Sequence, residues 1–268
     1  MALRIHRVEQ HRSTVPGIEP MTLVSNHHFP RHSHDQFGIG VIVSGAQRSW
    51  SGVGQVSASA GDVIMANPGE MHDGVPLDSS GRRWRMIYID PALVARELKE
   101  ETARPVEIVH PVAQDPLLAQ HFARLFACVT APRSDGLARD ERLLLSLMRI
   151  VRRHGLARPS ASRPSPRVAR AIQRLDSAPE APVSLAELAA LSGVSRFQLL
   201  RGFAREVGIT PHAYLVQRRV RLARRLLANG QTPVHAAMQA GFADQSHMTR
   251  AFVRQIGVTP SRYQAAIT

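Results

Sequence analysis

The sequence is short of cysteine and of long apolar runs. Its 268 residues include one cysteine, Cys128, so an intramolecular disulfide framework is excluded and a reducing cytoplasm is the simplest compartment. No apolar run approaches the roughly 20 residues that cross a bilayer, and we expect no membrane partner. The opening stretch, MALRIHRVEQHR, is charged from its fourth residue and lacks an apolar signal core. These absences exclude disulfide-stapled secreted domains and membrane-spanning proteins.

Lysine is also nearly absent, because all but one of the 34 basic residues are arginine. The positive charge is uneven: residues 156–268 contain 16 arginines and 5 acids, which gives +11 of the net +13. A general bias toward arginine would explain Arg in place of Lys, but not this asymmetry. A near-neutral first part joined to a strongly basic second part predicts that only the second part meets a polyanion.

Short apolar segments separated by Gly, Pro and Asn turns fill the chain up to about residue 90. We expect strands at 37–45, 47–50, 55–58, 63–66 and 83–90. Closely spaced strands of this kind predict a small β-barrel or double-sheet jelly roll. Two helices are expected next, at about 115–130 and at 137–154, the second with a leucine-rich face.

A change of composition marks the boundary between two domains. The segment GLARPSASRPSP is rich in Pro, Ser and Ala without apolar periodicity, so residues 156–166 are predicted to be a linker. We therefore expect an α+β multidomain protein, with a first domain at 1–155 and an all-helical second domain at 167–268.

A helix-turn-helix pattern occurs twice in the second domain, at 184–207 and at 232–256. In the first copy, Ser184 and Glu187 have the spacing of a capping box, Gly193 supplies the turn and Ser195 can cap the second helix. A long helix predicted at 211–228 connects the two copies.

The two copies match in their buried and in their outward positions. Phe203, Gly208 and Tyr214 recur 49 residues later as Phe252, Gly257 and Tyr263, and the turn glycine Gly193 recurs 48 residues later as Gly241. At the offset of 49 the outward residues pair as Phe197 with Ser246, Gln198 with His247, Arg201 with Arg250 and Arg205 with Arg254. Two readers of similar shape but different surface would read different base sequences. The alternative is a pair of helical hairpins with a structural role alone.

In these residues the chain resembles the AraC/XylS family of bacterial transcription regulators. The segment that carries the resemblance is GFADQSHMTRAFVRQIGVTPSRY at 241–263, with Arg219, Ala223 and Leu226-Leu227 in the connecting helix. Met248 and Ala236 depart from the larger residues that the family commonly has there, which suggests a slightly looser second core. The resemblance implies two helix-turn-helix units on one rigid helix, with recognition helices in successive major grooves about 34 Å apart.

On this reading the outward side chains divide into base readers and phosphate contacts. Arg201 and Arg250 can grip O6 and N7 of guanine as a fork, and Phe197 can pack on a thymine methyl. The other residues expected at base edges are Gln198, Gln245, Ser246 and His247. The residues expected to hold phosphates are Arg205, Arg254 and some of Arg218, Arg219, Arg221, Arg224 and Arg225. For each arginine a solvated surface charge is the alternative.

The first domain resembles the cupin-like sensor domain that many members of this family carry. The resemblance rests on His32-Ser33-His34, Gly61-Asp62, Asn67-Pro68-Gly69 and His72. In catalytic cupins a His-x-His pair, a carboxylate and a later histidine bind a metal, and alternation along a strand would put His32 and His34 on one face. Here Gln36, Asp35 and Glu70 are loose substitutes for the carboxylate. A three-histidine metal site stays open beside the favoured interpretation, in which there is no cofactor and the histidines hydrogen-bond an effector.

Aromatic residues in the same domain are candidate walls of an effector pocket. Trp50, Trp84 and Tyr88 combine an apolar body with a polar tip, which suits a small molecule. Ordinary barrel core is the alternative for each of them. Together with His32, His34 and His72 they form the predicted effector-binding set.

These features predict a DNA-binding transcriptional regulator, in this family more often an activator, controlled by a small molecule in the barrel. Its expected partners are double-stranded operator DNA, the effector, RNA polymerase and a second copy, which the resemblance places at the helices 115–130 and 137–154. Simple packing of those helices on the barrel is the alternative. Two rivals stay open, a metal-dependent cupin enzyme with an appended DNA-binding domain and a sequence-indifferent architectural DNA binder. The preferred prediction is not an enzyme.

Overall fold

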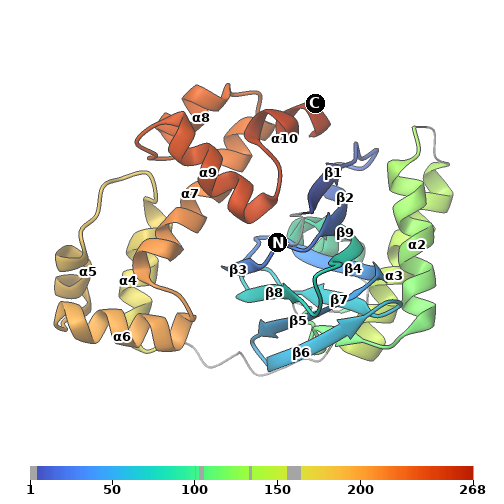
Figure 1. Ribbon diagram of the computed structural model, residues 1–268, viewed down its shortest axis with the longest axis horizontal. Coiled ribbons are helices and arrows are strands. Elements are labelled where there is room, and N and C mark those ends of the chain that lie inside the picture. The colour runs from blue at the N-terminus through green and yellow to red at the C-terminus, as the bar shows by residue number, and fades with distance from the viewer. Residues whose placement is uncertain (1–4, 100, 103–105, 133–134, 156–163, 268) are drawn as a thin grey trace. The chain divides into compact units, whose positions relative to one another are not determined.

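The computed structural model describes residues 5–99, 101–102, 106–132, 135–155 and 164–267 (Figure 1). The chain divides into two compact units, Met1–Arg158 and Pro159–Thr268. Most of the linker predicted at 156–166 lies outside the described residues. Within the described ranges, no helix has the length and hydropathy to cross a membrane.

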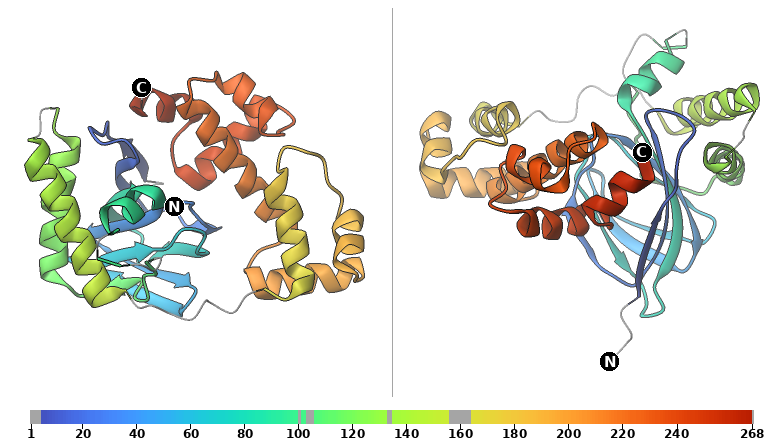
Figure 2. Two further views of the ribbon diagram at one scale, coloured as in Figure 1. Left: turned by 180° about the vertical axis from the view of Figure 1, so that it is seen from behind. Right: turned by 90° about the horizontal axis from the view of Figure 1, so that it is seen from above.

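Two antiparallel sheets build the first unit (Figure 2). The larger sheet has the order β1 (His6–Gln10), β2 (Ile18–Ser25), β9 (Arg82–Ile89), β4 (Phe37–Ser44), β7 (Val63–Ala66) and β10 (Val112–Ala113). The smaller sheet has the order β3 (Phe29–His32), β8 (His72–Pro76), β5 (Ala46–Ser51) and β6 (Gly54–Ser59). This arrangement confirms the predicted two-sheet β domain. The sequence did not predict β1, β2, β3, β8 or β10.

Helices cover one face of the larger sheet. They are α1 (Pro91–Glu97), α2 (Pro116–Thr130) and α3 (Gly136–His154). Ile87 and Ile89 of β9 share a buried core with Phe122 of α2 and Ile150 of α3. Because side chains alternate along a strand, the neighbouring residues of β9 face the smaller sheet instead. The space between the two sheets is therefore lined by Arg82, Trp84, Met86 and Tyr88 on the β9 side.

Glycines in β4 make room for that inner layer. A Cβ atom added at Gly40 would lie 2.1 Å from the Sδ of Met86, and one added at Gly38 would lie 3.4 Å from the ring of Tyr88. Both glycines are extended residues, so close approach and not backbone conformation requires them. The sequence FGIGVIVS thus puts Phe37 and Ile39 toward the helices and its glycines toward the interior.

One carboxylate joins the beginning of α2 to the end of α3. Asp115 caps α2 by accepting from the backbone N–H of Leu118 at 3.0 Å, and it accepts from Arg149 at 2.8 Å and from His154 Nε2 at 2.9 Å. Burial raises the pKa of Asp115, but the hydrogen bonds from Arg149, His154 and Leu118 outweigh it and hold that pKa well below its ordinary value of 3.8. His154 is the last residue of α3, so this cluster fixes the end of the first unit.

The second unit is all helical. Its elements are α4 (Pro166–Ser177), α5 (Leu185–Ser192), α6 (Arg196–Val207), α7 (Pro211–Ala228), α8 (Pro233–Gln239), α9 (Gln245–Ile256) and α10 (Pro260–Ile267). The pairs α5–α6 and α8–α9 are the two predicted helix-turn-helix units, and α7 connects them (Figure 1). The turn at Gly241 requires glycine, because φ is +79° and a Cβ would lie 2.4 Å from the carbonyl oxygen of Glu180.

The duplication extends to the packing of each core. Phe203 meets Tyr214 edge-on with ring centroids 5.6 Å apart, and Phe252 meets Tyr263 in the same way at 5.6 Å. Both phenylalanines are fully buried. Equal ring pairs at equal sequence separation mean that each unit closes its core on the helix that follows it.

Helix capping follows the predicted positions with one difference. Ser195 and Gln198 form a full capping box at the start of α6. Ser184 caps α5 by accepting from the N–H of Glu187 at 3.1 Å, but the Glu187 carboxylate accepts from Arg174 at 3.0 Å instead of closing the box predicted there. The ion pair attaches α5 to α4, so Glu187 contributes to tertiary packing.

Candidate nucleic-acid interface and histidine cluster

The outward residues of α6 lie on its exposed face. Phe197 is 65% exposed, which is unusual for a large apolar side chain, and the guanidinium of Arg201 lies 5.5 Å from the centre of its ring. Leu199 and Phe203 are buried on the opposite face. The whole outward set, Phe197, Gln198, Arg201 and Arg205, is exposed. The inward face therefore holds the helix in the unit, and the outward face is available to a partner.

Two of the α6 residues also have partners within the protein. The Gln198 side-chain oxygen accepts from the N–H of Ser195 at 3.0 Å, as part of the capping box. Arg205 donates to Glu206 at 3.1 Å, and Glu206 in turn accepts from the N–H of Ser165 at the start of α4. A DNA contact by Gln198 would therefore use its NH₂ group, and a phosphate would compete with Glu206 for Arg205.

Helix α9 presents the second outward set. Gln245, Ser246, Arg250 and Arg254 are exposed. His247 is half-buried, with its ring edge-on to Phe242 at 5.3 Å. Among the described residues, neither Arg250 nor Arg254 donates to an acid or to a backbone carbonyl. These two guanidinium groups are thus available to DNA without loss of a described hydrogen bond.

The arginines of α7 that were predicted as candidate phosphate contacts differ in their surroundings. Arg218 pairs with Asp176 of α4 at 2.9 Å, and Arg219 donates to the carbonyl oxygen of Pro179 at 2.8 Å. Both side chains therefore connect α7 to α4 and to the loop after it. Arg225 is exposed. Of these three, Arg225 is the one whose surroundings suit a phosphate contact.

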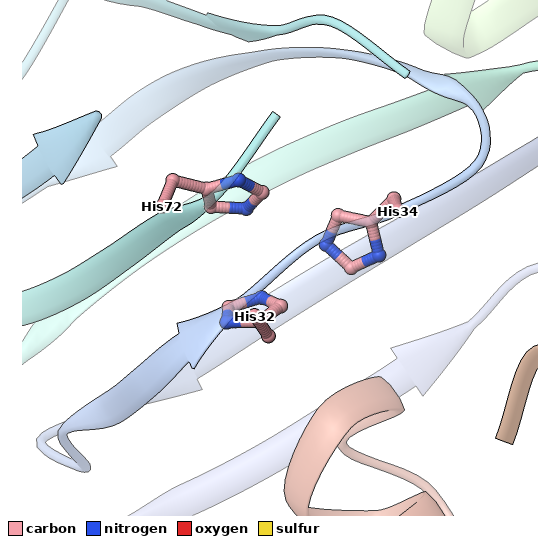
Figure 3. A group of neighbouring side chains, drawn as sticks. All are labelled: His32, His34 and His72. Carbon is pink, nitrogen blue, oxygen red and sulfur yellow. The ribbon is translucent and has the colours of Figure 1, made fainter. Parts of the chain in front are cut away.

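In the first unit, three predicted histidines come together between the sheets (Figure 3). His32 ends β3 and lies opposite His72 of β8 in the strand register. Their ring centroids are 4.6 Å apart, and His34 lies 4.9 Å from His32 and 5.2 Å from His72. His34 follows the end of β3, so the alternation predicted for His32 and His34 along one strand is not what joins them. The β3–β8 pairing and the segment after β3 do so.

Backbone carbonyls fix the tautomers of two of these rings. The Nδ1 of His32 donates to the carbonyl oxygen of Pro30 at 2.7 Å, and the Nδ1 of His72 donates to that of Glu70 at 3.0 Å. A carbonyl can only accept, so in the neutral ring the lone pair is on Nε2. Burial lowers the pKa of His72 and outweighs the hydrogen bond to the Glu70 carbonyl and the charges of Glu70 and Asp73, so it favours the neutral form of that ring.

Two of the three loose substitutes for the carboxylate, Glu70 and Gln36, have hydrogen-bond partners outside the histidine cluster. The Glu70 carboxylate accepts from the side chain of Asn67 at 2.9 Å, and the Gln36 amide donates to Asp90 at 2.9 Å and to Glu19 at 3.2 Å. The group of side chains close enough to share an ion consists of His32, His34 and His72 alone in the part of the chain that is described. An imidazole-only donor set fits a transition metal, and the four-ligand set of catalytic cupins is absent from it.

The three aromatic candidates occupy two different faces. Trp84 and Tyr88 face the space between the sheets, where Tyr88 lies 4.8 Å from the ring of His34. The side chain of Gln47 points inward to Arg82. Trp50 is three residues further along β5, so its side chain lies on the opposite, outer face of the strand. There Arg31 covers its ring at 3.9 Å. The geometry therefore separates Trp50 from the other predicted effector residues.

An interior cation, Arg82, was missing from the predicted set. It is 3% exposed, and it donates to Gln47 at 2.7 Å and to the carbonyls of Gly74 and His27 at 3.3 Å. Its guanidinium lies 4.5 Å from the ring of Trp84, and burial lowers its pKa to about 10. All these acceptors are neutral. Alternation along RRWRMIYI, which puts Arg82 on the face of Trp84, is the sequence signal that could have identified it.

Comparison with protein families agrees with this division of the chain. Residues 23–147 match the AraC-like ligand binding domain, and residues 188–266 match a helix-turn-helix domain. The HTH-type transcriptional regulator YbfI of Bacillus subtilis is 31% identical over 225 residues, which cover 82% of this chain and 81% of that protein. The virulence regulon transcriptional activator VirF of Yersinia enterocolitica is 42% identical over 77 residues, which cover 28% of this chain and 27% of VirF.

Solved structures show the same fold at low sequence identity. Apo ToxT of Vibrio cholerae superposes with a TM-score of 0.57 and 13% identity, over 96% of this chain and 100% of that one. Wild-type ToxT bound to an unsaturated fatty acid has a TM-score of 0.56 and 12% identity, over 99% of this chain and 96% of that one. At such identity the likeness concerns the fold.

Proposed function

Since this chain belongs to the AraC family of helix-turn-helix transcriptional regulators, we propose that it activates transcription at a specific operator under control of a small molecule bound between its two sheets. The observation that carries the proposal is the duplicated reader: α6 and α9 repeat the same buried ring pair and differ on their outward faces. A structural hairpin would have no need of exposed Phe197, Arg201 and Arg250 at matched positions.

In this proposal α6 and α9 read bases and their last turns hold the backbone. Arg201 and Arg250, at mid-helix, each face a guanine, where a bidentate contact discriminates by about 1–3 kcal/mol. Base-edge contacts also come from Phe197, Gln198, Gln245, Ser246 and His247. Arg205 and Arg254 hold phosphates, which position the protein without reading sequence.

The effector site is proposed at the inner face of β9 and the histidine cluster. It comprises His32, His34, His72, Trp84 and Tyr88, with Arg82 added and Trp50 omitted. Arg82 is a buried cation with only neutral acceptors, and such a charge favours an anionic ligand. ToxT, which shares this fold, has been crystallised with a fatty acid, which is an anion at neutral pH. We infer an acidic small molecule as the effector.

The proposed assembly and output rest on what the resemblance to the family implies. We propose a homodimer through α2 and α3, and an operator-bound form that recruits RNA polymerase. VirF, which matches 28% of this chain, is named as an activator, and this supports activation over repression. Control requires that the effector bind two arrangements of the protein with different affinity. We propose the cytoplasm as its working compartment, because the operator DNA of a bacterial regulator is there.

The deciding experiment compares duplexes at one salt concentration. A duplex selected from a random pool by the purified full chain should bind more tightly than a scrambled duplex of equal length, by about 10³-fold or more. Equal affinity for both would make the protein a sequence-indifferent binder and would exclude the proposal. Small carboxylic acids are then screened for a shift in melting temperature of the full chain, with neutral analogues as controls.

The rival reading as a metal-dependent enzyme makes a different prediction. It requires conversion of a substrate, with activity lost in His32→Ala while binding to the selected duplex persists. The regulator proposal requires no turnover, and it expects His32→Ala to change the response of DNA binding to the effector.

A further inference from the structure

We propose that His32, His34 and His72 bind one divalent transition-metal ion, with a coordination position left open for an acidic group of the effector. This inference deepens the proposed function, because it gives the sensor site a metal that the ligand reaches through one of its oxygens. Its first part, metal binding, stands on the geometry of the three rings alone.

The rings of His32, His34 and His72 lie close together (Figure 3). One ring nitrogen of each histidine lies within 4.8 Å of the ring nitrogens of the other two. Three nitrogens at about 2.1 Å from a tetrahedral zinc ion are about 3.4 Å apart. To reach that separation, each pair of ring nitrogens has to move closer by at most about 1.4 Å, which side-chain rotation can supply. His32 and His72 are held for this by the β3–β8 register, which puts them opposite each other.

Hydrogen bonds to backbone carbonyls orient two of the rings in the way that metal-binding histidines require. Histidines that bind metals nearly always donate their other ring N–H to a carbonyl or carboxylate, which orients the ring and makes it more basic. His32 and His72 both do this, through Nδ1 to Pro30 and to Glu70. The arrangement therefore has both the ligand nitrogens and the outer acceptors that support them, on two separate segments.

The donor set then selects the kind of ion. Imidazole suits Zn²⁺, Cu²⁺, Fe²⁺ and Ni²⁺, whereas Mg²⁺ and Ca²⁺ prefer oxygen ligands. Three neutral ligands leave the charge of the ion uncompensated, since no carboxylate belongs to this group among the described residues. An anion in the open position would supply that charge. This requirement agrees with the acidic effector inferred from Arg82, although it rests on different residues.

The test measures metal on the untagged full chain, since a histidine tag would bind metal itself. Purified wild type, His72→Gln and His34→Gln are titrated with Co²⁺ and followed by visible absorption, and the metal retained from growth is measured by mass spectrometry. The matched control is His28→Gln, a substitution at an exposed histidine four residues from His32. Melting curves show whether each variant is folded.

We expect one ion per chain in wild type and in His28→Gln. His72→Gln and His34→Gln should weaken Co²⁺ binding by more than the roughly 10–100-fold that loss of an outer-shell partner costs. Wild type that binds Co²⁺ no more tightly than the two folded variants would overturn the inference. If one cluster variant does not fold, the other decides in the same way.

A second measurement separates this inference from the proposed function. Binding to the selected duplex is followed with and without Zn²⁺ and a carboxylic acid. Sequence-specific binding without any metal uptake overturns the metal site and leaves the regulator. Metal uptake by a chain that shows no sequence preference supports the site and removes the proposed function.

Discussion

At the residue scale, chemical identity on the outer face of α9 decides what the helix can read. Arg250 and Arg254 lie one turn apart on the same exposed face, and each has its guanidinium available. The position along the helix gives them different roles, because mid-helix side chains reach base edges and side chains of the last turn reach the backbone. Two arginines on one helix can therefore be tested against each other.

Arg250→Ala should weaken the binding free energy for the selected duplex by about 1–3 kcal/mol and relax specificity at one base position. Arg254→Ala should weaken binding to all duplexes about equally and reduce the slope of log affinity against log salt by about 1. Fluorescence anisotropy with single-base variants of the duplex measures both. If the two substitutions gave the same pattern across those variants, the division of roles would be wrong.

One buried carboxylate, that of Asp115, contributes strongly to the stability of the first unit. Asp115→Asn should destabilise the first unit by about 3 kcal/mol, because Arg149 then lacks its carboxylate partner. Both tryptophans, Trp50 and Trp84, are in this unit, so tryptophan fluorescence during urea unfolding follows it alone. Asp140→Asn, at an exposed pair with Arg139, is the control and should change little.

The pH dependence follows from the same group. Because the folded-state pKa of Asp115 is depressed, its contribution is complete above the ordinary pKa of 3.8 and is lost as the pH falls below it. The wild type should therefore lose stability between neutral pH and strongly acidic pH by more than Asp115→Asn does. Parallel curves for the two proteins would contradict this account of the pKa.

At the scale of elements, α3 presents an apolar stripe of exposed leucines. Leu137 is 79% exposed, and Leu144 and Leu145 are 40% and 39% exposed. They recur at i, i+7 and i+8, which puts them on one side of the helix. The buried side of α3 meanwhile contributes Leu143, Leu147 and Ile150 to the core that it shares with α2 and the larger sheet. The helix thus serves the core on one side and suits a second copy on the other.

Leu144→Lys combined with Leu145→Lys should convert the proposed dimer to a monomer, since the cost of burying two ammonium groups exceeds the gain from the interface. Light scattering after size-exclusion chromatography measures the mass. Val53→Lys, at an exposed turn position, is the control and should leave the mass unchanged. A dimer that persists in the double variant would place the interface elsewhere.

The elements that sequence predicted well are those with strong local patterns. Segments such as FGIGVIVS and the leucine-rich α3 have one clear apolar face, and the structure begins and ends them within a residue or two of the prediction. By contrast, β2 contains Pro20, and β8 is short with Gly74 at its centre. Pairing with neighbouring strands stabilises such segments, and a single-sequence pattern does not reveal those neighbours.

The candidate sites show the same limit. The outward faces of α6 and α9 could be predicted because helical periodicity alone fixes which residues point away from the core. In the first unit, facing depends on strand register, so Trp50 was grouped with the interior and Arg82 was missed. The resemblance to cupins predicted the three histidines, and the β3–β8 pairing together with the segment after β3 brings them close to one another.

At the scale of the whole molecule, the chain separates a sensing unit from a reading unit that differ in charge. The second part contributes +11 of the net +13, so long-range attraction to DNA acts almost entirely on it. The near-neutral first unit would then bind the proposed acidic effector through a local site. Binding of DNA should therefore weaken steeply with salt, while binding of the effector should depend on salt much less.

The helix α7 has a consequence for the operator. Its 18 residues join two readers of different surface in a fixed order along one polypeptide. A DNA site read by two different recognition helices in a fixed order is asymmetric and has a direction, whereas a palindromic site has none. Reversing the operator in front of a reporter gene, with its distance to the promoter kept, should therefore keep DNA affinity and abolish activation. Equal activation in both orientations would show that the two readers are interchangeable.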